Sequence, residues 1–390
     1  ERSPYYRRTF DAAGIKPSDI RTLDDLQRIP FLTKAEIIEN EKANPPFGDF
    51  LAVSPDDIVR IFVQPGPEYI YCTQEDLDYT IDGTAKGFYA AGTRRGDIAD
   101  TTSMFHWVTG GTLADAAFMR IGASALPGGV GGKRMHLDVM RQTKVTVIQA
   151  FTTFLESLAD EAKEMGIAPK KDLFLRLGLI GGEFRSEGSR EELERTLGIR
   201  ICEGYGCSEL PDAAYECPEG GGMHLHGDQI YEFIDPETGK SVPPGESGEI
   251  VITETFRKAM PLIRYRTGDV TRGLNLDPCP CGRTMPRLLK IVGRVGDIAR
   301  VKGEFITPGL VRGMVGNHPE LGRFQMIVER PKATDELTVK VEYKEPLDVD
   351  SMVKVLAKEL QESLRIKTNV DLVREGAIPE GASILDDRRI

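Results

Sequence analysis

Apolar residues recur along this chain with two periods, one typical of amphipathic helices and one typical of buried strands. Helical spacing predicts helices over residues 75–91, 112–121, 137–143, 154–165 and 189–197. Short apolar runs next to turn residues predict strands over residues 58–63, 123–126, 145–148 and 177–180. Strands and helices that alternate at this pitch favour an α/β fold with a largely parallel sheet.

The pattern changes twice in the rest of the chain. After about residue 199, short β-rich runs at residues 231–234, 248–253 and 288–292 alternate with turn segments. From about residue 300, a compact α+β unit is predicted, with helices at 308–315 and 348–364 and strands at 324–328, 336–343 and 369–373. We therefore expect a large domain over residues 1–293, with a β-rich module at about 200–292, and a small domain over 294–390.

Composition narrows the class of protein. The 390 residues carry 50 Lys+Arg against 61 Asp+Glu, a formal net charge of −11. This acidic balance repels polyphosphate, so we expect no nucleic-acid partner. No apolar run approaches the roughly 18 residues that a membrane helix needs, so we expect no membrane partner. Because the first residue is Glu1, the natural start of the chain is expected to lie upstream.

The six cysteines are too few for a disulfide scaffold, but two of them form a close pair. Cys279 and Cys281 are separated only by Pro280, a spacing that suits two thiolates binding one metal ion better than it suits a disulfide. A reducing, cytoplasmic setting is the simplest expectation for such thiols.

Four short motifs occur in a fixed order. They are Gly-Tyr-Gly-Cys-Ser-Glu at 204–209, Arg-Tyr-Arg-Thr-Gly-Asp at 264–269, Cys-Pro-Cys-Gly-Arg at 279–283 and Gly-Arg-Val-Gly-Asp at 293–297. In this order the chain resembles the adenylate-forming (AMP-binding) superfamily, specifically its phenylacetate–coenzyme A ligase branch. The resemblance covers nearly the whole chain, including Ser-Pro-Tyr-Tyr-Arg at 3–7 and Phe-Leu-Thr-Lys at 31–34.

The resemblance implies a multi-layer α/β domain with a β-rich module, a small C-terminal lid domain and a two-step reaction. In that family a carboxylate attacks the α-phosphorus of ATP, and the lid then rotates to present coenzyme A to the acyl-adenylate. We accordingly expect ATP or AMP, Mg²⁺, coenzyme A and an aromatic or similar small organic acid as ligands. A homodimer is common in the family and is also expected.

The family's functional positions map onto this chain residue by residue. Glu209 matches the catalytic Mg²⁺ ligand, since Mg²⁺ prefers carboxylate oxygen. The nucleotide-binding positions are Gly182, Glu183, Tyr205, Gly206, Ser208, Asp269 and Arg294. Among these, Tyr205 is expected to lie against adenine and Asp269 to accept from the ribose hydroxyls. Each residue in isolation fits a simpler interpretation, such as a turn residue or a solvated charge at a helix start.

Two aromatic clusters fall where the family lines its acyl pocket. Phe105, His106 and Phe151 are therefore candidates for substrate contacts by their position, although aromatic clusters more often belong to hydrophobic cores. The glycine-rich segment at residues 128–133 lacks the spacing of a nucleotide-binding P-loop and is expected to be a flexible turn.

The close cysteine pair resembles half of a structural zinc site. Cys217 and His224 supply the other half in the family, which gives a Cys₃His set with Cys279 and Cys281. Such a closed tetrahedral set is structural rather than catalytic. His226 competes with His224 because both side chains fall on one face of a strand. A free-thiol pair beside a surface histidine is the alternative.

The chain departs from the family at two phosphate-handling positions. Residues 64–69 form a degenerate phosphate loop, Gln-Pro-Gly-Pro-Glu-Tyr, where the family has a longer Ser/Thr/Gly-rich loop with a lysine. Two prolines remove backbone N–H donors, and Glu68 adds negative charge. Near the C-terminus, Ala382 stands where the family has its adenylation lysine. Both departures predict weak or absent adenylation.

Three functions remain open on these observations. The first is an AMP-forming acid–coenzyme A ligase with weakened ATP activation. The second is a non-catalytic protein, derived from such a ligase, that binds a nucleotide or an acyl-coenzyme A. The third is an enzyme that handles thioesters without ATP.

Overall fold

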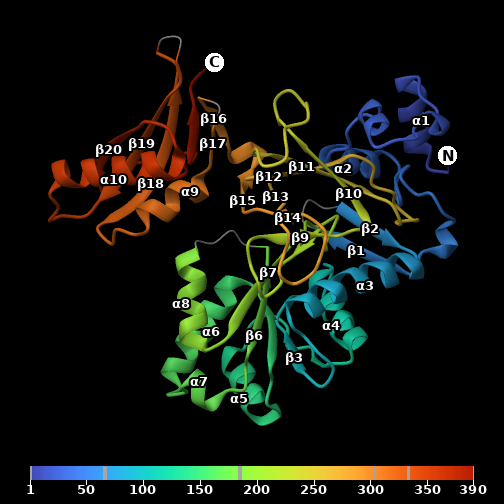
Figure 1. Cartoon of the computed structure of the whole chain (residues 1–390), viewed down its shortest axis with the longest axis horizontal. Coiled ribbons are helices and arrows are strands. Elements are labelled where there is room, and N and C mark those ends of the chain that lie inside the picture. Colours follow the sequence, from blue (N-terminus) through green and yellow to red (C-terminus); the bar gives the residue numbers. More distant parts are fainter. Residues whose placement is uncertain (1, 65–67, 183–186, 303, 332–333, 390) are drawn as a thin grey trace. The chain divides into compact units, whose positions relative to one another are not determined.

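The computed structural model describes residues 2–64, 68–182, 187–302, 304–331 and 334–389 (Figure 1). The chain divides into two compact units, Glu1–Thr267 with Gly273–Lys290, and Gly268–Arg272 with Ile291–Ile390. Within the described ranges, no helix is long and apolar enough to cross a membrane. The boundary expected at residues 293–294, between the large domain and the small C-terminal domain, stays a prediction.

A mixed sheet organises the first unit, with strands in the order β13-β14-β9-β8-β7-β6-β5-β3-β4. The parallel strands are β4 Ser124–Leu126, β3 Ile98–Thr101, β5 Val147–Ala150, β6 Leu177–Gly181 and β7 Arg200–Tyr205. Short antiparallel strands extend the sheet beyond β7, namely β8 Ala214–Tyr215, β9 Met223–Leu225, β14 Arg287–Leu288 and β13 Leu274–Asn275. The predicted α/β fold is confirmed.

Consecutive residues of a strand point to opposite sides of the sheet, so these strands have apolar side chains to bury on both faces. Helices cover both faces. Ile148 of β5 packs in a core with α5 Lys133–Thr143, α6 Thr152–Glu164 and α8 Glu187–Leu197. The preceding residue, Val147, packs in a second core with α3 Gln74–Ala91 and α4 Gly110–Ile121. In sheets of this kind, ligands bind at the carboxyl ends of the strands.

The remaining elements of the first unit surround this layered core. They are α1 Pro4–Ala13, α2 Lys34–Ala43, α7 Pro169–Asp172, the hairpin of β1 Arg60–Gln64 and β2 Glu68–Cys72, and the antiparallel pair β10 Gln229–Ile234 and β11 Gly248–Glu254. Helix α2 begins with a capping box, in which Thr33 and Glu36 bond reciprocally to each other's backbone N–H. The predicted phosphate loop includes residues 65–67, which lie outside the described residues.

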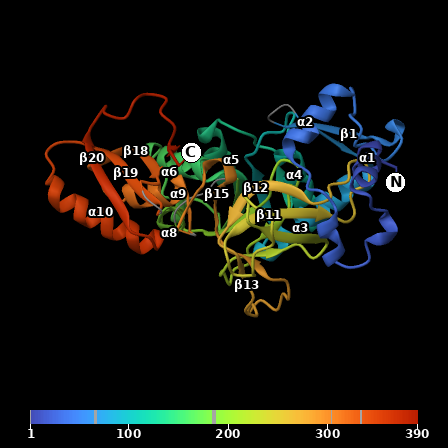
Figure 2. The same ribbon diagram turned by 90° about the horizontal axis from the view of Figure 1, so that it is seen from above.

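The second unit contains a four-stranded sheet in the order β20-β19-β18-β21. Its elements are β16 Ala299–Val301, β17 Glu304–Ile306, α9 Pro308–Val315, β18 Leu321–Glu329, β19 Glu336–Tyr343, α10 Val349–Leu364, β20 Thr368–Arg374 and β21 Leu385–Asp387. Figures 1 and 2 both show α10 alongside β20, and the two helices share a core with the sheet.

The prediction of one strand over residues 288–292 is wrong. Strand β14 ends at Leu288, and a separate strand, β15 Ile291–Arg294, begins three residues later. The two have different partners, because β14 pairs with β9 whereas β15 pairs with the end of β12 Tyr265–Thr271. One apolar run therefore supplies two sheets.

Candidate functional site

Glu209 lies in the loop after β7 and is only 2% exposed. Its Oε1 accepts a hydrogen bond from Lys34 Nζ at 2.9 Å. The same ammonium lies 2.7 Å from Oε2 of Glu68, whose side chain is fully buried at the start of β2. The capping box of α2 holds Lys34 at the helix start, so one cation is placed between two buried carboxyl groups.

The pKa values of the two carboxyl groups shift in opposite directions. Burial raises the pKa of Glu68, and the adjacent Glu209 raises it further. Burial would also raise the pKa of Glu209, but hydrogen bonds from Glu68 and Lys34 lower it overall. The Lys34 ammonium therefore lies beside one carboxyl group whose pKa is raised and one whose pKa is lowered.

The nucleotide-binding residues predicted in the first unit lie at the ends of adjacent strands. Gly182 follows β6 with a φ of +78°, and a Cβ there would meet a ring carbon of Phe151 at 2.8 Å. Tyr205 ends β7 and is buried. Gly206 follows it so tightly that a Cβ would lie 2.4 Å from the Pro211 carbonyl oxygen, which explains the glycine.

Ser208 lies half-buried in the same loop, whereas Glu183 lies outside the described residues. The roles of these residues toward a nucleotide stay predictions.

Asp269 and Arg294 meet in the second unit. They are register partners on β12 and β15, and Arg294 Nε donates to Asp269 Oδ1 at 2.9 Å. The Asp269 carboxylate is buried, whereas the guanidinium side chain is mostly exposed. The predicted ribose acceptor is therefore already oriented by a cation that the sequence also assigns to the nucleotide.

A partly open cavity of about 170 Å³ lies against the ends of β6 and β7 in the first unit. Its wall includes Gly181, Gly204 and Tyr205, next to the predicted nucleotide loop. Phe105, His106 and Phe151 are not among the described residues that line it, so their assignment to the substrate stays a prediction.

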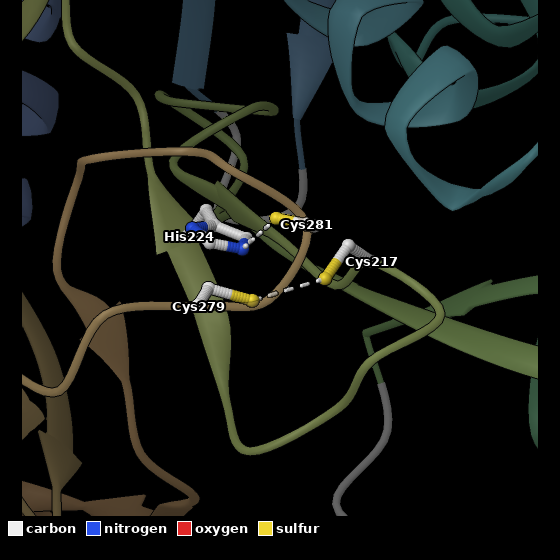
Figure 3. Close-up of side chains that lie close together, drawn as sticks. All are labelled: Cys217, His224, Cys279 and Cys281. Atoms are coloured by element: carbon white, nitrogen blue, oxygen red, sulfur yellow. Dashed lines mark hydrogen bonds between the residues drawn. The ribbon is translucent and has the colours of Figure 1, made fainter.

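Four metal-ligating side chains gather at the antiparallel end of the sheet (Figure 3). The ligand atoms of Cys217, His224, Cys279 and Cys281 all lie within 4.8 Å of one another. The Sγ atoms of Cys217 and Cys279 are 3.7 Å apart, and Cys281 Sγ is 3.4 Å from His224 Nε2. His226 is outside this group, and its ring packs edge-on against Tyr215.

These separations match a tetrahedral zinc site. Zn–S bonds of about 2.3 Å and Zn–N bonds of about 2.1 Å place neighbouring ligand atoms about 3.6–3.8 Å apart. His224 Nδ1 lies 3.3 Å from the Met285 carbonyl oxygen, an outer contact of the kind that leaves Nε2 free for a metal. The donor set therefore fits zinc.

Sequence reasoning missed Lys34 and Glu68 as partners of Glu209. The capping box at Thr33 and Glu36 marks the start of a helix at Lys34, but nothing in the local sequence indicates a partner 175 residues away. Asp212 and Glu203, which line the cavity, were also missed because half-buried carboxyls follow no periodic pattern.

Comparisons with known proteins give consistent matches. The family model described as AMP-binding enzyme matches residues 80–256, and the model described as AMP-binding enzyme C-terminal domain matches residues 303–387. The phenylacetate-coenzyme A ligase of Aromatoleum evansii is 33% identical over 377 residues, which are 94% of this chain and 83% of that protein. The enzyme of the same name from Thermus thermophilus is 32% identical, with 93% and 82% covered.

A solved structure is similar over almost the whole chain. An open conformation of 2-hydroxyisobutyryl-CoA ligase, in complex with 2-HIB-AMP and CoA, has a TM-score of 0.88 and 25% identity. The match covers 98% of this chain and 87% of that one.

Proposed function

Because this chain belongs to the AMP-binding enzyme family, as a relative of the phenylacetate–coenzyme A ligases, we propose that it joins a small aromatic acid to coenzyme A. The predicted family and the class of AMP-forming acid–coenzyme A ligase are confirmed. We propose a small acid as the substrate because of where the cavity lies. Its wall includes Gly181, Gly204 and Tyr205, so an acid bound there has its carboxylate beside the predicted nucleotide loop.

Residues of the loop after β7 have separate roles in this proposal. Tyr205 packs against adenine, and Glu209 offers the carboxylate oxygen that Mg²⁺ prefers. Bound Mg²⁺ would neutralise phosphate charge. Lys34 already neutralises Glu209, so it competes with a cation for this carboxylate.

In the second unit, Asp269 accepts hydrogen bonds from the ribose hydroxyls while Arg294 orients the Asp269 carboxylate. Residues 294–390 serve as the lid.

Pyrophosphate release with a panel of aromatic and short-chain acids tests the activation step. We expect acid-dependent release from ATP that is lost in Glu209→Gln, because that variant lacks the ionised carboxylate. Release that is absent with every acid, or unchanged in Glu209→Gln, would contradict the proposed role of the site.

A second function is favoured by the Lys34 contacts. An ammonium lies where a divalent cation is expected, and this arrangement suits a protein that binds AMP or acyl-coenzyme A without turnover. Calorimetry with ATP, AMP, coenzyme A and an acyl-coenzyme A separates the two functions. AMP binding without ATP binding favours the binding protein or an ATP-independent thioester enzyme.

We also propose that the Cys₃His group holds a structural zinc ion. Zinc would contribute folding energy by joining β9, through His224, to the two loops that carry the cysteines. The zinc ion would leave no open position for substrate.

The homodimer and the cytoplasmic location stay predictions.

A further inference from the structure

The cavity beside β6 and β7 is large enough for one ring and little more. Its volume of about 170 Å³ compares with the roughly 150 Å³ of an apolar cavity that accepts benzene. An aromatic acid bound there would bury its ring and keep its carboxylate outside. Polar side chains of the wall can then contact a substituent on the ring.

The wall has an apolar side and an acidic side. Phe88, Leu113 and Leu179 supply apolar surface from α3, α4 and β6. Glu203 of β7 and Asp212, in the segment between β7 and β8, add carboxyl groups. A pocket made only for an unsubstituted ring would not need these half-buried acids, because withdrawing carboxyl groups from water costs free energy.

Neither of these two carboxyls has a cationic partner within 4 Å among the described residues. Arg190, a nearby cation, instead pairs with Glu216 at 3.0 Å. Asp212 has room beside α3 because Gly83 lacks a side chain, and a Cβ there would lie 1.7 Å from Asp212 Oδ2. The fold thus makes space for an acid without an ion pair within 4 Å among the described residues, while Arg257 and Lys86 act on its pKa from farther away.

His226 gives a second, independent indication of a polar ligand. Its side chain is 5% exposed and lines the same cavity. Its ring packs against Tyr215, with centroids 4.9 Å apart, and its ring nitrogens make no hydrogen bond to any described residue. The imidazole therefore has ring nitrogens that a ligand in the cavity can bond.

We propose that the acid bound in this cavity carries a primary amine at the end remote from its carboxylate, and that Glu203 and Asp212 bind the ammonium group. This inference rests on the proposed function only in placing the acid in the cavity. The ammonium supplies a cation at ion-pairing distance, which these two carboxyls lack among the described residues, and it has three N–H donors to offer to the two carboxyls and the imidazole. Phe88, Leu113 and Leu179 contact the ring.

The electrostatics of the empty cavity agree with this assignment. Burial raises the pKa of Glu203 to about 7, with Glu216 adding to the effect. Burial also raises the pKa of Asp212 well above its usual range, with Glu254 adding to it. A bound ammonium reverses both effects, so the acids regain charge when the ligand arrives.

Calorimetry with two acids of equal size tests the proposal without requiring turnover. The probes are 4-(aminomethyl)benzoate and 4-ethylbenzoate, which differ only in the terminal nitrogen or carbon. We expect the wild-type protein to bind the amine at least tenfold more tightly, because an ethyl group leaves the buried polar groups unpaired. In Asp212→Asn and in Glu203→Gln, we expect that preference to shrink several-fold.

The matched control is Asp160→Asn, which removes an exposed carboxylate from α6. It should keep the wild-type preference. Equal or tighter binding of 4-ethylbenzoate by the wild type would overturn the proposal, as would a full preference for the amine in both cavity variants. Pyrophosphate release with 4-ethylbenzoate but no amine preference would overturn this inference alone. Amine-selective binding without release would instead contradict the ligase function.

Discussion

At the residue scale, the candidate site depends on one ammonium group that the fold places beside two buried carboxyl groups. Lys34 neutralises Glu209 and also contacts Glu68, which sequence reasoning expected only to repel phosphate. The residue types of the loop after β7 were predictable from the sequence because the motif is contiguous. The Lys34 contacts were not, because they join residues brought together only by the tertiary fold.

Replacing Lys34 by Met tests the weight of this ion pair. The variant leaves two buried carboxyl groups facing each other, so we expect it to lower the free energy of unfolding by about 2–3 kcal/mol. The control is Lys86→Met, which breaks an ion pair with Asp228 that is 56% and 37% exposed. Its cost should stay below about 1 kcal/mol. Equal losses in chemical denaturation would contradict the role given to Lys34.

Glu41 gives a pH-dependent prediction away from the site. Its side chain is buried, Oε2 accepts from Tyr69 N–H at 3.2 Å, and Oε1 has no hydrogen-bond partner among the described residues. Burial raises the pKa of Glu41 to about 7, above its unfolded value. Its stabilising contribution is therefore complete below about pH 4.5 and is lost as the pH rises through about 7.

Glu41→Gln removes this titration while keeping the size of the side chain. The variant should gain about 1–3 kcal/mol of unfolding free energy relative to the wild type between pH 5 and pH 8. Urea denaturation at the two pH values measures it. A difference between the proteins that does not change with pH would show that Glu41 is ionised throughout.

At the scale of elements, periodicity predicted most of the helices and strands. The helix at residues 308–315 and the strand at 336–343 have the predicted bounds, because each is one uninterrupted apolar pattern. The prediction of one strand over residues 288–292 failed because the two halves of this apolar run join different sheets. The two-residue strand β8 has no period to detect, although it extends the sheet toward the Cys₃His group.

Measuring the zinc content of the protein tests whether the Cys₃His group holds a metal ion that links the short strands. After exhaustive dialysis we expect one zinc ion per chain, lost in Cys279→Ser together with a lower melting temperature. Cys72→Ser is the control, since Cys72 is a buried cysteine of β2 outside the group. Wild-type protein without zinc, or zinc retained in Cys279→Ser, would rule out this site.

At the scale of the whole molecule, both units match the family, and the two departures predicted from the sequence concern ATP activation. Ala382, in the second unit, is predicted to stand at the family's lysine position. Arg388 is a weak substitute because it already pairs with Glu329 and Asp386. The resemblance gave the family from contiguous motifs. It could not give the acid, because the cavity wall combines residues from α3, α4 and several strands.

Restoring the lysine should speed adenylation selectively. In Ala382→Lys we expect pyrophosphate release to rise at least tenfold, since one positioned charge donor is worth about 10²–10³ in such steps. Thioester formation from supplied acyl-adenylate should change little. Ala377→Lys places the same charge at an exposed position nearby and should leave both steps unchanged. An equal rise in the two variants would indicate a general charge effect.

The central claim is that this chain is an AMP-forming acid–coenzyme A ligase, and product analysis tests it most directly. The purified protein is incubated with ATP, Mg²⁺, coenzyme A and a panel of small acids that includes 4-(aminomethyl)benzoate, and AMP and acyl-coenzyme A are measured by mass spectrometry. We predict equal amounts of AMP and thioester, dependent on the acid and lost in Glu209→Gln. Thioester formed without AMP, or no thioester with any acid, would contradict the claim.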